Sequence, residues 1–391
     1  MNILSKKKIV VLGMLTKMPV AGVIWQTMQY LVGLERLGYE AYYVEAHART
    51  PSMLMVHDDD DSSLLAAQCI DRVLRRFDLP DRWAFHALHD DGRCYGMSLL
   101  QLRQLYKDAA LIINLHGGTT PLPEHYATGR LAYLETDPVE LQIELHDNLQ
   151  TTIDFLEPHC AFFTFGENYG RPDCKLPLTE RFTFKPTRQP VVADWWRPHG
   201  HVVPDVWTTI GNWRQDQRPV KLDGELYYWS KHHEFLKFLD LPAHTSETFE
   251  LALASYGPAD RALLEQKGWR VRSALSVSED IDVYRRYITG SRGEFTVAKD
   301  QNIRLRSGWF SDRSATYLAT GRPVITQETG FSNIFPTGVG LFGFSTLEEA
   351  AGAVESVRAD YARHSQTAAT IGREWFNYDV VLTPLLQSVG V

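Results

Sequence analysis

Two polar loops within the segment SGWFSDRSATYLATGRPVITQETG (residues 307–330) carry groups that could bind a ligand. The first loop, residues 307–311, precedes a helix that we predict to begin near Asp312, with Ser311 as its N-cap. Backbone N–H groups at the positive end of a helix form a natural anion site. The loop therefore predicts phosphate binding, with an ordinary capped helix as the alternative.

Three residues around this helix start bear on the same prediction. Gly308 would let a ligand approach the backbone closely. Asp312 could either cap the helix or face a phosphate, and Arg313 could pair with a phosphate. An exposed helix arginine is an equally good interpretation of Arg313.

The second loop, QETG at residues 327–330, follows the short apolar run PVIT. Its amide, carboxylate and hydroxyl groups lie beside a glycine, which is what a site needs to hydrogen-bond several sugar hydroxyls. Glu328 and Gly330 are the residues we expect at that contact. The alternative is a polar β-turn.

Three apolar runs in the first half of the chain each end in a polar cluster. ALIINL stops at His116, RLAYLET at Asp137, and CAFFTFG at Glu167. In open α/β sheets, ligands bind beyond the carboxyl ends of the strands. We expect a general base among these three residues, with Asp137 first because a carboxylate at a cleft edge can accept a proton from an acceptor hydroxyl. His116, which titrates near neutrality, is second and Glu167 third. Each could instead be structural.

The elements that would position these loops alternate between strands and helices. The first unit predicts a strand at 8–14, a helix at 22–37 ending at Gly38, and a strand at 39–46, which implies parallel strands with a right-handed crossover. Residues 183–207 contain four prolines without a sustained period, which is typical of a linker.

After this linker the α/β alternation restarts, with a strand in WTTIGNW, a helix in KHHEFLKFLDL, a strand in FELALASYG and a helix in PADRALLEQKGW. The stretch from residue 347 to 387 predicts two helices and no further strand. We therefore expect two α/β halves divided near residue 205.

Composition limits the class of protein. The 391 residues fit two to three domains, and 44% hydrophobic with 23% charged residues is ordinary for a globular enzyme. The net charge of −8 argues against nucleic acid as a partner. No apolar run reaches the ~20 residues that span a bilayer. Four widely spaced cysteines fit a reducing cytoplasm, and a lysine within the N-terminal apolar stretch argues against a signal peptide.

The acidic run Asp58–Asp61 contains the Asp-x-Asp spacing that some enzymes use for a divalent metal. Four adjacent carboxylates in a polar loop are more often a solvated turn or a helix start. The run also lies far in sequence from the predicted phosphate site. We therefore expect no metal and no other cofactor; positive potential from the helix end, with Arg313 or Lys231, could replace a metal.

A helix ending in A-T-G-x-P-V-I and followed by Q-E-T-G resembles the donor-binding half of glycosyltransferases of the GT-B fold. The segments FTFGENYGRPDCKLP and PTRQPVVADWW also resemble a group of bacterial glycosyltransferases. The resemblance covers most of the chain. It implies an α/β protein with two Rossmann-like domains facing across a cleft and C-terminal helices crossing back. The implied boundaries are an acceptor-binding domain at 1–205, a donor-binding domain at 206–375, and a helix at 376–391 packing on the first domain.

The same resemblance implies roles for single residues. The helix start at Ser311 and Asp312 faces the diphosphate, and the turn at Glu328 and Gly330 faces the donor sugar. A loop after the first strand of the second half also faces the diphosphate, and a loop of the first half faces the acceptor. The implied donor set is Gly211, Asn212, Trp213, Lys231, Ser307, Gly308, Ser311, Asp312, Arg313, Glu328 and Gly330, and the implied acceptor set is Gly22 and Trp25.

The sequence departs from the plant-type pattern because it lacks the His-Cys-Gly-Trp-Asn motif, and no histidine follows its first strand. The usual catalytic base is therefore not transferable. We expect a cytoplasmic hexosyltransferase that moves a sugar from a nucleotide-diphosphate sugar, UDP-sugar favoured, to a hydroxyl of a small-molecule or glycan acceptor. Alternatives are a nucleotide-sugar epimerase of the same fold and a non-catalytic nucleotide-sugar sensor. A dehydrogenase is disfavoured, because no G-x-G-x-x-G follows the first strand.

Overall fold

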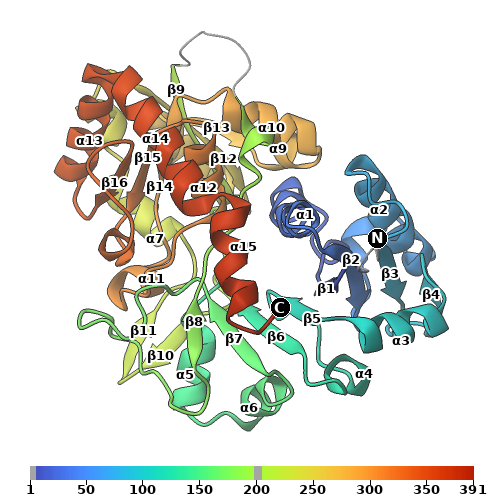
Figure 1. The fold of residues 1–391 in the computed structure, drawn as a ribbon. Coiled ribbons are helices and arrows are strands. Elements are labelled where there is room, and N and C mark those ends of the chain that lie inside the picture. The colour runs from blue at the N-terminus through green and yellow to red at the C-terminus, as the bar shows by residue number, and fades with distance from the viewer. Residues whose placement is uncertain (1–5, 198–204) are drawn as a thin grey trace.

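The computed structural model describes residues 6–197 and 205–391, and it contains two large sheets, one in each half of the chain (Figure 1). The sheet of the first half has the order β4-β3-β2-β1-β5-β6-β7-β8. Its pairings are parallel except that β4 runs antiparallel to β3. The strands are β1 Lys8–Leu12, β2 Glu40–Ala46, β3 Trp83–His86, β4 Cys94–Tyr95, β5 Leu111–Leu115, β6 Leu131–Glu135, β7 Ala161–Thr164 and β8 Phe184–Pro186.

The sheet of the second half is wholly parallel and has the order β13-β12-β9-β14-β15-β16. This is the 3-2-1-4-5-6 order of a doubly wound nucleotide-binding fold. Its strands are β9 Val206–Asn212, β12 Thr248–Ala254, β13 Arg270–Ser273, β14 Gly293–Thr296, β15 Val324–Gln327 and β16 Leu341–Phe344. A small hairpin, β10 Val220–Leu222 with β11 Glu225–Tyr227, stands apart from it. The prediction of two α/β halves is confirmed.

Helices connect the strands of both sheets. Those of the first half are α1 Ala21–Arg36, α2 Ser62–Arg76, α3 Leu99–Asp108, α4 Pro123–Tyr126, α5 Glu140–His146 and α6 Gln150–Leu156. Those of the second half are α7 His232–Phe235, α8 Pro258–Gln266, α9 Leu275–Ser278, α10 Ile281–Thr289, α11 Asp300–Arg304, α12 Asp312–Ala319, α13 Leu347–Ala359, α14 Tyr361–Phe376 and α15 Tyr378–Gln387. Short 3-10 turns are η1 Ser52–Leu54, η2 Ala193–Trp196, η3 Leu236–Phe238, η4 Leu241–His244 and η5 Phe331–Asn333.

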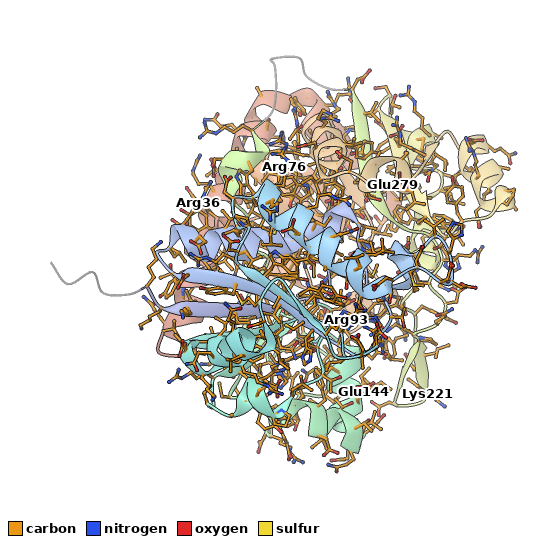
Figure 2. The ribbon with its side chains drawn as sticks, turned by 90° about the vertical axis from the view of Figure 1, so that its right-hand side faces the viewer. Arg36, Arg76, Arg93, Glu144, Lys221 and Glu279 are labelled. Carbon is orange, nitrogen blue, oxygen red and sulfur yellow. The ribbon has the colours of Figure 1, made fainter. Side chains whose placement is uncertain are left out.

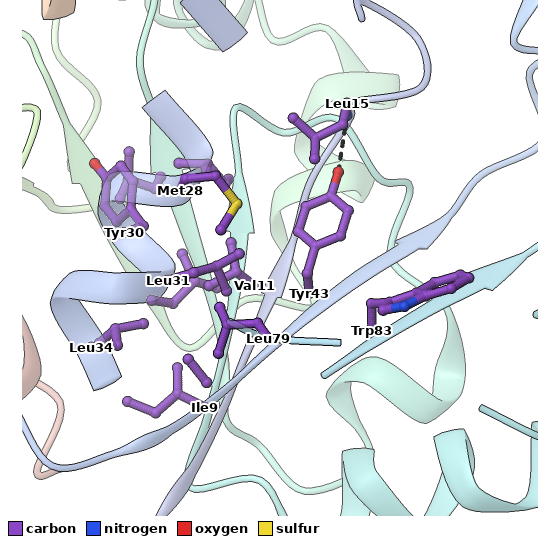
Figure 3. Close-up of a cluster of buried hydrophobic side chains, with 14 of the residues drawn as sticks. Ile9, Val11, Leu15, Met28, Tyr30, Leu31, Leu34, Tyr43, Leu79 and Trp83 are labelled. Atoms are coloured by element: carbon purple, nitrogen blue, oxygen red, sulfur yellow. Dashed lines mark hydrogen bonds between the residues drawn. The ribbon is translucent and has the colours of Figure 1, made fainter. Parts of the chain in front are cut away.

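The core of the first half follows from β1 being buried on both faces. Ile9 and Val11 point to one face, where they pack with Leu31 and Leu34 of α1 (Figure 3). The alternate residues of β1 join a separate cluster on the opposite face, which α3 covers. The hydroxyl of Tyr43 accepts a hydrogen bond of 2.9 Å from the backbone N–H of Leu15. That bond ties the loop after β1 to β2.

Three local predictions were wrong. Part of the expected linker forms β8, which pairs with β7, and the turn η2; Pro198 and Pro204 lie outside the described residues. The helix expected in KHHEFLKFLDL ends at Phe235 and continues as short 3-10 turns. The C-terminal stretch forms three helices, because Asn377 is extended and separates α14 from α15.

The two halves contact each other at several places. Figure 1 shows α15, in red, leaving the second half and lying beside the first, where its leucines join the core around β1. Arg76 of α2, labelled in Figure 2, donates a hydrogen bond of 3.0 Å to Asp282 of α10. No helix within the described residues is long and apolar enough to cross a membrane.

Candidate functional site

Lys231, immediately before α7, is a half-buried cation with no hydrogen-bonding partner among the described residues. Its ammonium lies 5.4 Å from the ring centroid of Trp309. Burial, with the nearby charges of Arg313 and Lys299, lowers the pKa of Lys231 to about 7. An anion placed beside this ammonium would favour its charged form.

The start of α12 lies near this lysine, since Asp312 acts electrostatically on Lys231. Ser311 occupies the N-cap position with extended backbone angles, but its side chain accepts no hydrogen bond from the first turn. Its hydroxyl instead points to Asp312 Oδ1, at 3.5 Å. The prediction of Ser311 as the N-cap of a helix that begins at Asp312 is confirmed, but the Ser311 side chain makes no capping hydrogen bond. The Ser311 side chain leaves the first N–H groups of α12 unsatisfied, but the Asp312 carboxylate lies beside the N–H of Arg313, so only the other N–H groups are available to an anion.

Arg313 is an internal residue of the site. Its guanidinium donates to Glu294, 2.6 Å away, and to the backbone carbonyl of Ile210. Glu294 is fully buried, and its charge raises the pKa of Arg313. The pair fixes α12 against β9 and β14, and Glu294 balances the charge of Arg313.

The carboxyl end of β9 lies in the same region, since the carbonyl of Ile210 accepts from Arg313. A Cβ atom added at Gly211 would meet nothing within 4 Å, so the backbone there borders open space. Asn212 is half-buried. Trp213, in contrast, is fully buried and stacks on Phe235 with ring centroids 5.7 Å apart. Gly211 and Asn212 are therefore accessible to a ligand, whereas Trp213 belongs to the core.

The two polar loops are bonded to each other. Gly308 N donates to Thr329 O over 2.7 Å, and the Thr329 hydroxyl donates to Trp309 O over 2.7 Å. Glu328 accepts a hydrogen bond from the backbone N–H of Gly330. Ser307 is fully buried and donates to Asn302 over 2.8 Å. Internal bonds therefore occupy most polar groups of these loops.

Of the three expected bases, Asp137 and Glu167 form ion pairs. Both carboxylate oxygens of Asp137 accept from the ammonium of Lys299, each over 2.7 Å. Glu167 accepts from Arg188, and burial raises the pKa of Glu167 to about 7. The Asp137 pair joins the two halves, because β6 precedes Asp137 and β14 precedes Lys299.

His116 differs from both carboxylates. Its Nδ1 lies 2.8 Å from the hydroxyl of Thr136, while its Nε2 has no hydrogen-bonding partner in the part of the chain that the structure describes. Burial lowers the pKa of His116 to about 4, so the ring is neutral near pH 7. Its φ of 65° is unusual for a residue with a side chain and is a feature found at functional sites.

The two expected acceptor residues lie in α1. The added Cβ of Gly22 would be 3.6 Å from the hydroxyl of Tyr284, so Gly22 borders α10. Trp25 is 5% exposed, packs against Trp196 at 4.8 Å between centroids, and donates its indole N–H to Ile281 O over 2.9 Å. Trp25 therefore packs α1 against α10.

The acidic run serves local structure. Asp61 is the N-cap of α2 and accepts from Leu64 N over 2.9 Å, and Asp60 accepts from two backbone N–H groups. This confirms the interpretation as a helix start. Within residues 6–197 and 205–391, a metal-like grouping occurs at Asp216, His232 and His233. Both ring nitrogens of His232 are engaged there, one 2.6 Å from the Ser230 hydroxyl and the other 3.2 Å from an Arg214 nitrogen.

No protein-family model matches the chain, and no curated protein matches it either. Among solved structures, it is similar to an alpha-glucosyltransferase in complex with UDP and a 13-mer DNA containing a HMU base, with a TM-score of 0.61 and 10% identity over 99% of this chain and 100% of the other. AviGT4, a glycosyltransferase involved in avilamycin A biosynthesis, has a TM-score of 0.54 and 12% identity over 98% and 97%. Anabaena Alr3699/HepE in complex with UDP-glucose has a TM-score of 0.53 and 12% identity over 98% and 99%.

The chain has the GT-B fold. In this GT-B chain, Lys231, the start of α12 and the loop after β9 all belong to the second half. His116 and the Asp137 region belong to the first half. Trp309 connects the two groups, because its indole N–H donates to Thr136 O over 3.1 Å while its ring lies beside Lys231. The GT-B fold therefore gathers the main polar groups at the carboxyl ends of both sheets.

The sequence interpretation overlooked three residues of this region. Glu294 lies within β14 and Lys299 follows that strand, which has only four residues and was not predicted from the sequence. Asn168 follows β7, where only Glu167 drew attention. A signal for Lys299 is its place after the apolar run EFTVA, which marks it as one more strand-end residue.

Proposed function

We propose that this protein is a glycosyltransferase that moves a hexosyl group from a nucleotide-diphosphate sugar to an acceptor hydroxyl. The observation that carries the proposal is the half-buried ammonium of Lys231, which has no hydrogen-bonding partner among the described residues and lies near the start of α12, whose N–H groups the Ser311 side chain does not cap. A diphosphate bound there would gain both a cation and backbone N–H donors. Two of the three similar structures contain UDP or UDP-glucose, which favours UDP as the nucleotide.

The reaction needs stabilisation of the departing diphosphate. Lys231 and the free N–H groups at the start of α12 would supply it without a metal ion. Glu328 and Gly330 stay our proposed sugar contacts, with Gly211 and Asn212 beside the diphosphate. The four free cysteines fit a reducing compartment, and we place the protein in the cytoplasm.

We propose His116 as the general base ahead of Asp137 and Glu167. Its Nε2 has no partner among the described residues and carries a free lone pair in the tautomer in which Nδ1 donates to Thr136. Both carboxylates pair with a cation, although Oε1 of Glu167 is also without a partner among those residues. The lone pair would accept the proton of an acceptor hydroxyl. The acceptor we propose is a small molecule or glycan; a similar structure contains DNA, but the charge of −8 disfavours a polyanionic acceptor here.

A thermal-shift panel of UDP-glucose, GDP-glucose and dTDP-glucose tests the proposal. A ligand at 100 times its dissociation constant adds about 2.7 kcal/mol of stability, which is a shift of several degrees. UDP-glucose should stabilise the wild type, and Lys231→Met should remove most of that shift. A flat response to all three sugars would refute the proposal. Measured transfer to a hydroxyl acceptor, with release of UDP, would separate a transferase from an epimerase or a sensor.

A further inference from the structure

Asn168 follows β7 in the first half of the chain, yet it lies between the two polar loops of the second half. Its exposed fraction is 0%. Its backbone N–H donates to Ser307 O over 3.2 Å, and its side-chain amide donates to Arg306 O over 2.9 Å. A residue of the first half therefore bonds the backbone at the beginning of the loop that leads to α12.

The rest of the Asn168 side chain is also satisfied. Its amide nitrogen lies 3.1 Å from Asp173 Oδ1, and its amide oxygen accepts from Asn333 Nδ2 over 2.9 Å. Asp173 in turn binds the guanidinium of Arg306 at 2.6 Å. We call Asn168, Asp173, Arg306 and Asn333 the amide clamp. The clamp joins the loop after β7 to the segments on both sides of the donor loops.

Two glycines show that the loops are shaped around Asn168. Gly308 has φ +81°, and a Cβ atom there would lie 2.3 Å from the backbone nitrogen of Asn168. Gly330 has φ +98°, and a Cβ atom there would lie 2.7 Å from the amide nitrogen of Asn168. Both distances are shorter than real Cβ contacts. Asn168 therefore occupies the space that we had expected Gly308 to leave for a ligand.

The clamp is connected to the groups that face the ligand. Gly308 is followed by Trp309, whose ring lies beside Lys231, and three residues later α12 begins. Gly308 is also bonded to Thr329 in the second loop. A displacement of Asn168 would therefore be transmitted to Trp309 and to the backbone before α12.

We propose that Asn168 is a positioning residue of the donor site, through which the first half of the chain sets the geometry of both donor loops. This inference takes its ligand from the proposed function. The positioning of the two loops by Asn168 does not depend on that function. Donor affinity would then depend on a residue that touches no donor atom. The side chain of Asn168 donates two hydrogen bonds and accepts one. Aspartate cannot replace it, because a carboxylate oxygen would then face the backbone oxygen of Arg306 and the carboxylate oxygen of Asp173.

The test uses the full-length protein and UDP as the probe in titration calorimetry, at a temperature where every variant is folded. Asn168→Ala should weaken UDP binding at least tenfold, and Asn168→Asp should weaken it at least as much. Asn333→Ala, at an exposed position in the second half, should weaken it about threefold. The losses of the two single variants should be less than additive in Asn168→Ala/Asn333→Ala, because the two residues share a hydrogen bond, while Asn333 also donates to Asp173.

Arg76→Ala is the matched control, since it also breaks a contact between the halves but lies on α2, away from the donor loops. It should leave UDP affinity within twofold of the wild type. If Asn168→Ala and Asn333→Ala lower the melting temperature and yet bind UDP as the wild type does, Asn168 serves packing alone and the proposal is overturned.

Hydrogen exchange separates this proposal from the proposed function. In the ligand-free Asn168→Ala variant, the amides of residues 307–311 and 328–330 should exchange at least tenfold faster, while β9 stays protected. Unchanged exchange in both loops would overturn the positioning role. If the wild-type protein binds no UDP, the proposed function is wrong. Faster exchange in Asn168→Ala would still show that Asn168 orders these two loops.

Discussion

Donor binding should depend on pH through Lys231. Its pKa of about 7 in the free protein means that about nine tenths of the molecules carry the charge at pH 6, and about one tenth at pH 8. A bound diphosphate favours the ammonium, so the pKa rises on binding and a proton is taken up. Affinity is then full below pH 7 and is lost as the pH rises. UDP-glucose should bind about tenfold more weakly at pH 8 than at pH 6.

Titration calorimetry with UDP-glucose measures this difference, and the ligand has no group that titrates in the same range. In Lys231→Met the affinity should be low at both pH values and differ by less than twofold between them. Lys237→Met is the matched control, because Lys237 is an exposed lysine paired with Glu234. Equal wild-type affinities at pH 6 and pH 8, or an unchanged slope in Lys231→Met, would refute the role of Lys231.

Four further outcomes are expected. His116→Ala should lower turnover of UDP-glucose by about 10²–10⁴-fold while UDP affinity is retained; near-normal turnover would exclude His116 as the base. Gly308→Ala should lower stability by about 1–3 kcal/mol in urea melts, because its Cβ collides with Asn168. Trp25→Ala should cost about 3–5 kcal/mol, since it empties the contact between α1 and α10, and a cost below 1 kcal/mol would contradict that packing role. Activity should survive excess EDTA; loss that Mn²⁺ restores would show a metal at the leaving group.

Much of the first half was predictable because its central strands are buried on both faces. β1, β5 and β6 are mostly apolar runs, and the polar residues His116 and Asp137 follow β5 and β6 at the carboxyl edge of the sheet. The helix α12 was also predictable, since Asp312 begins it and Gly321, with φ +73°, follows its end. These signals are local, so a single sequence reveals them.

The remaining parts of the site depend on contacts between distant residues. Lys299 and Asp137 are 162 positions apart, and nothing near either one in sequence indicates that they pair. A glycine is needed at Gly308 and Gly330 whether a ligand or Asn168 fills the space beside them. The sequence near these glycines therefore does not distinguish the two cases. The sequence shows that both residues are glycines, but the residue that requires them to be glycines, Asn168, lies in the other half of the chain.

Because α15 is the last helix and packs on the first half of the chain, the first half cannot complete its core until synthesis is nearly finished. Leu382, Leu385 and Leu386 belong to the same core as Ile9 and Val11, so the first half contains apolar surface that only the last helix covers. Between β8 and α15 a ribosome must add about 190 residues, which takes roughly 10–40 s at common elongation rates. During that interval the nascent first half exposes the groove that α15 will fill. Nascent chains stalled before residue 378 should therefore be held by chaperones longer than chains released at Val391.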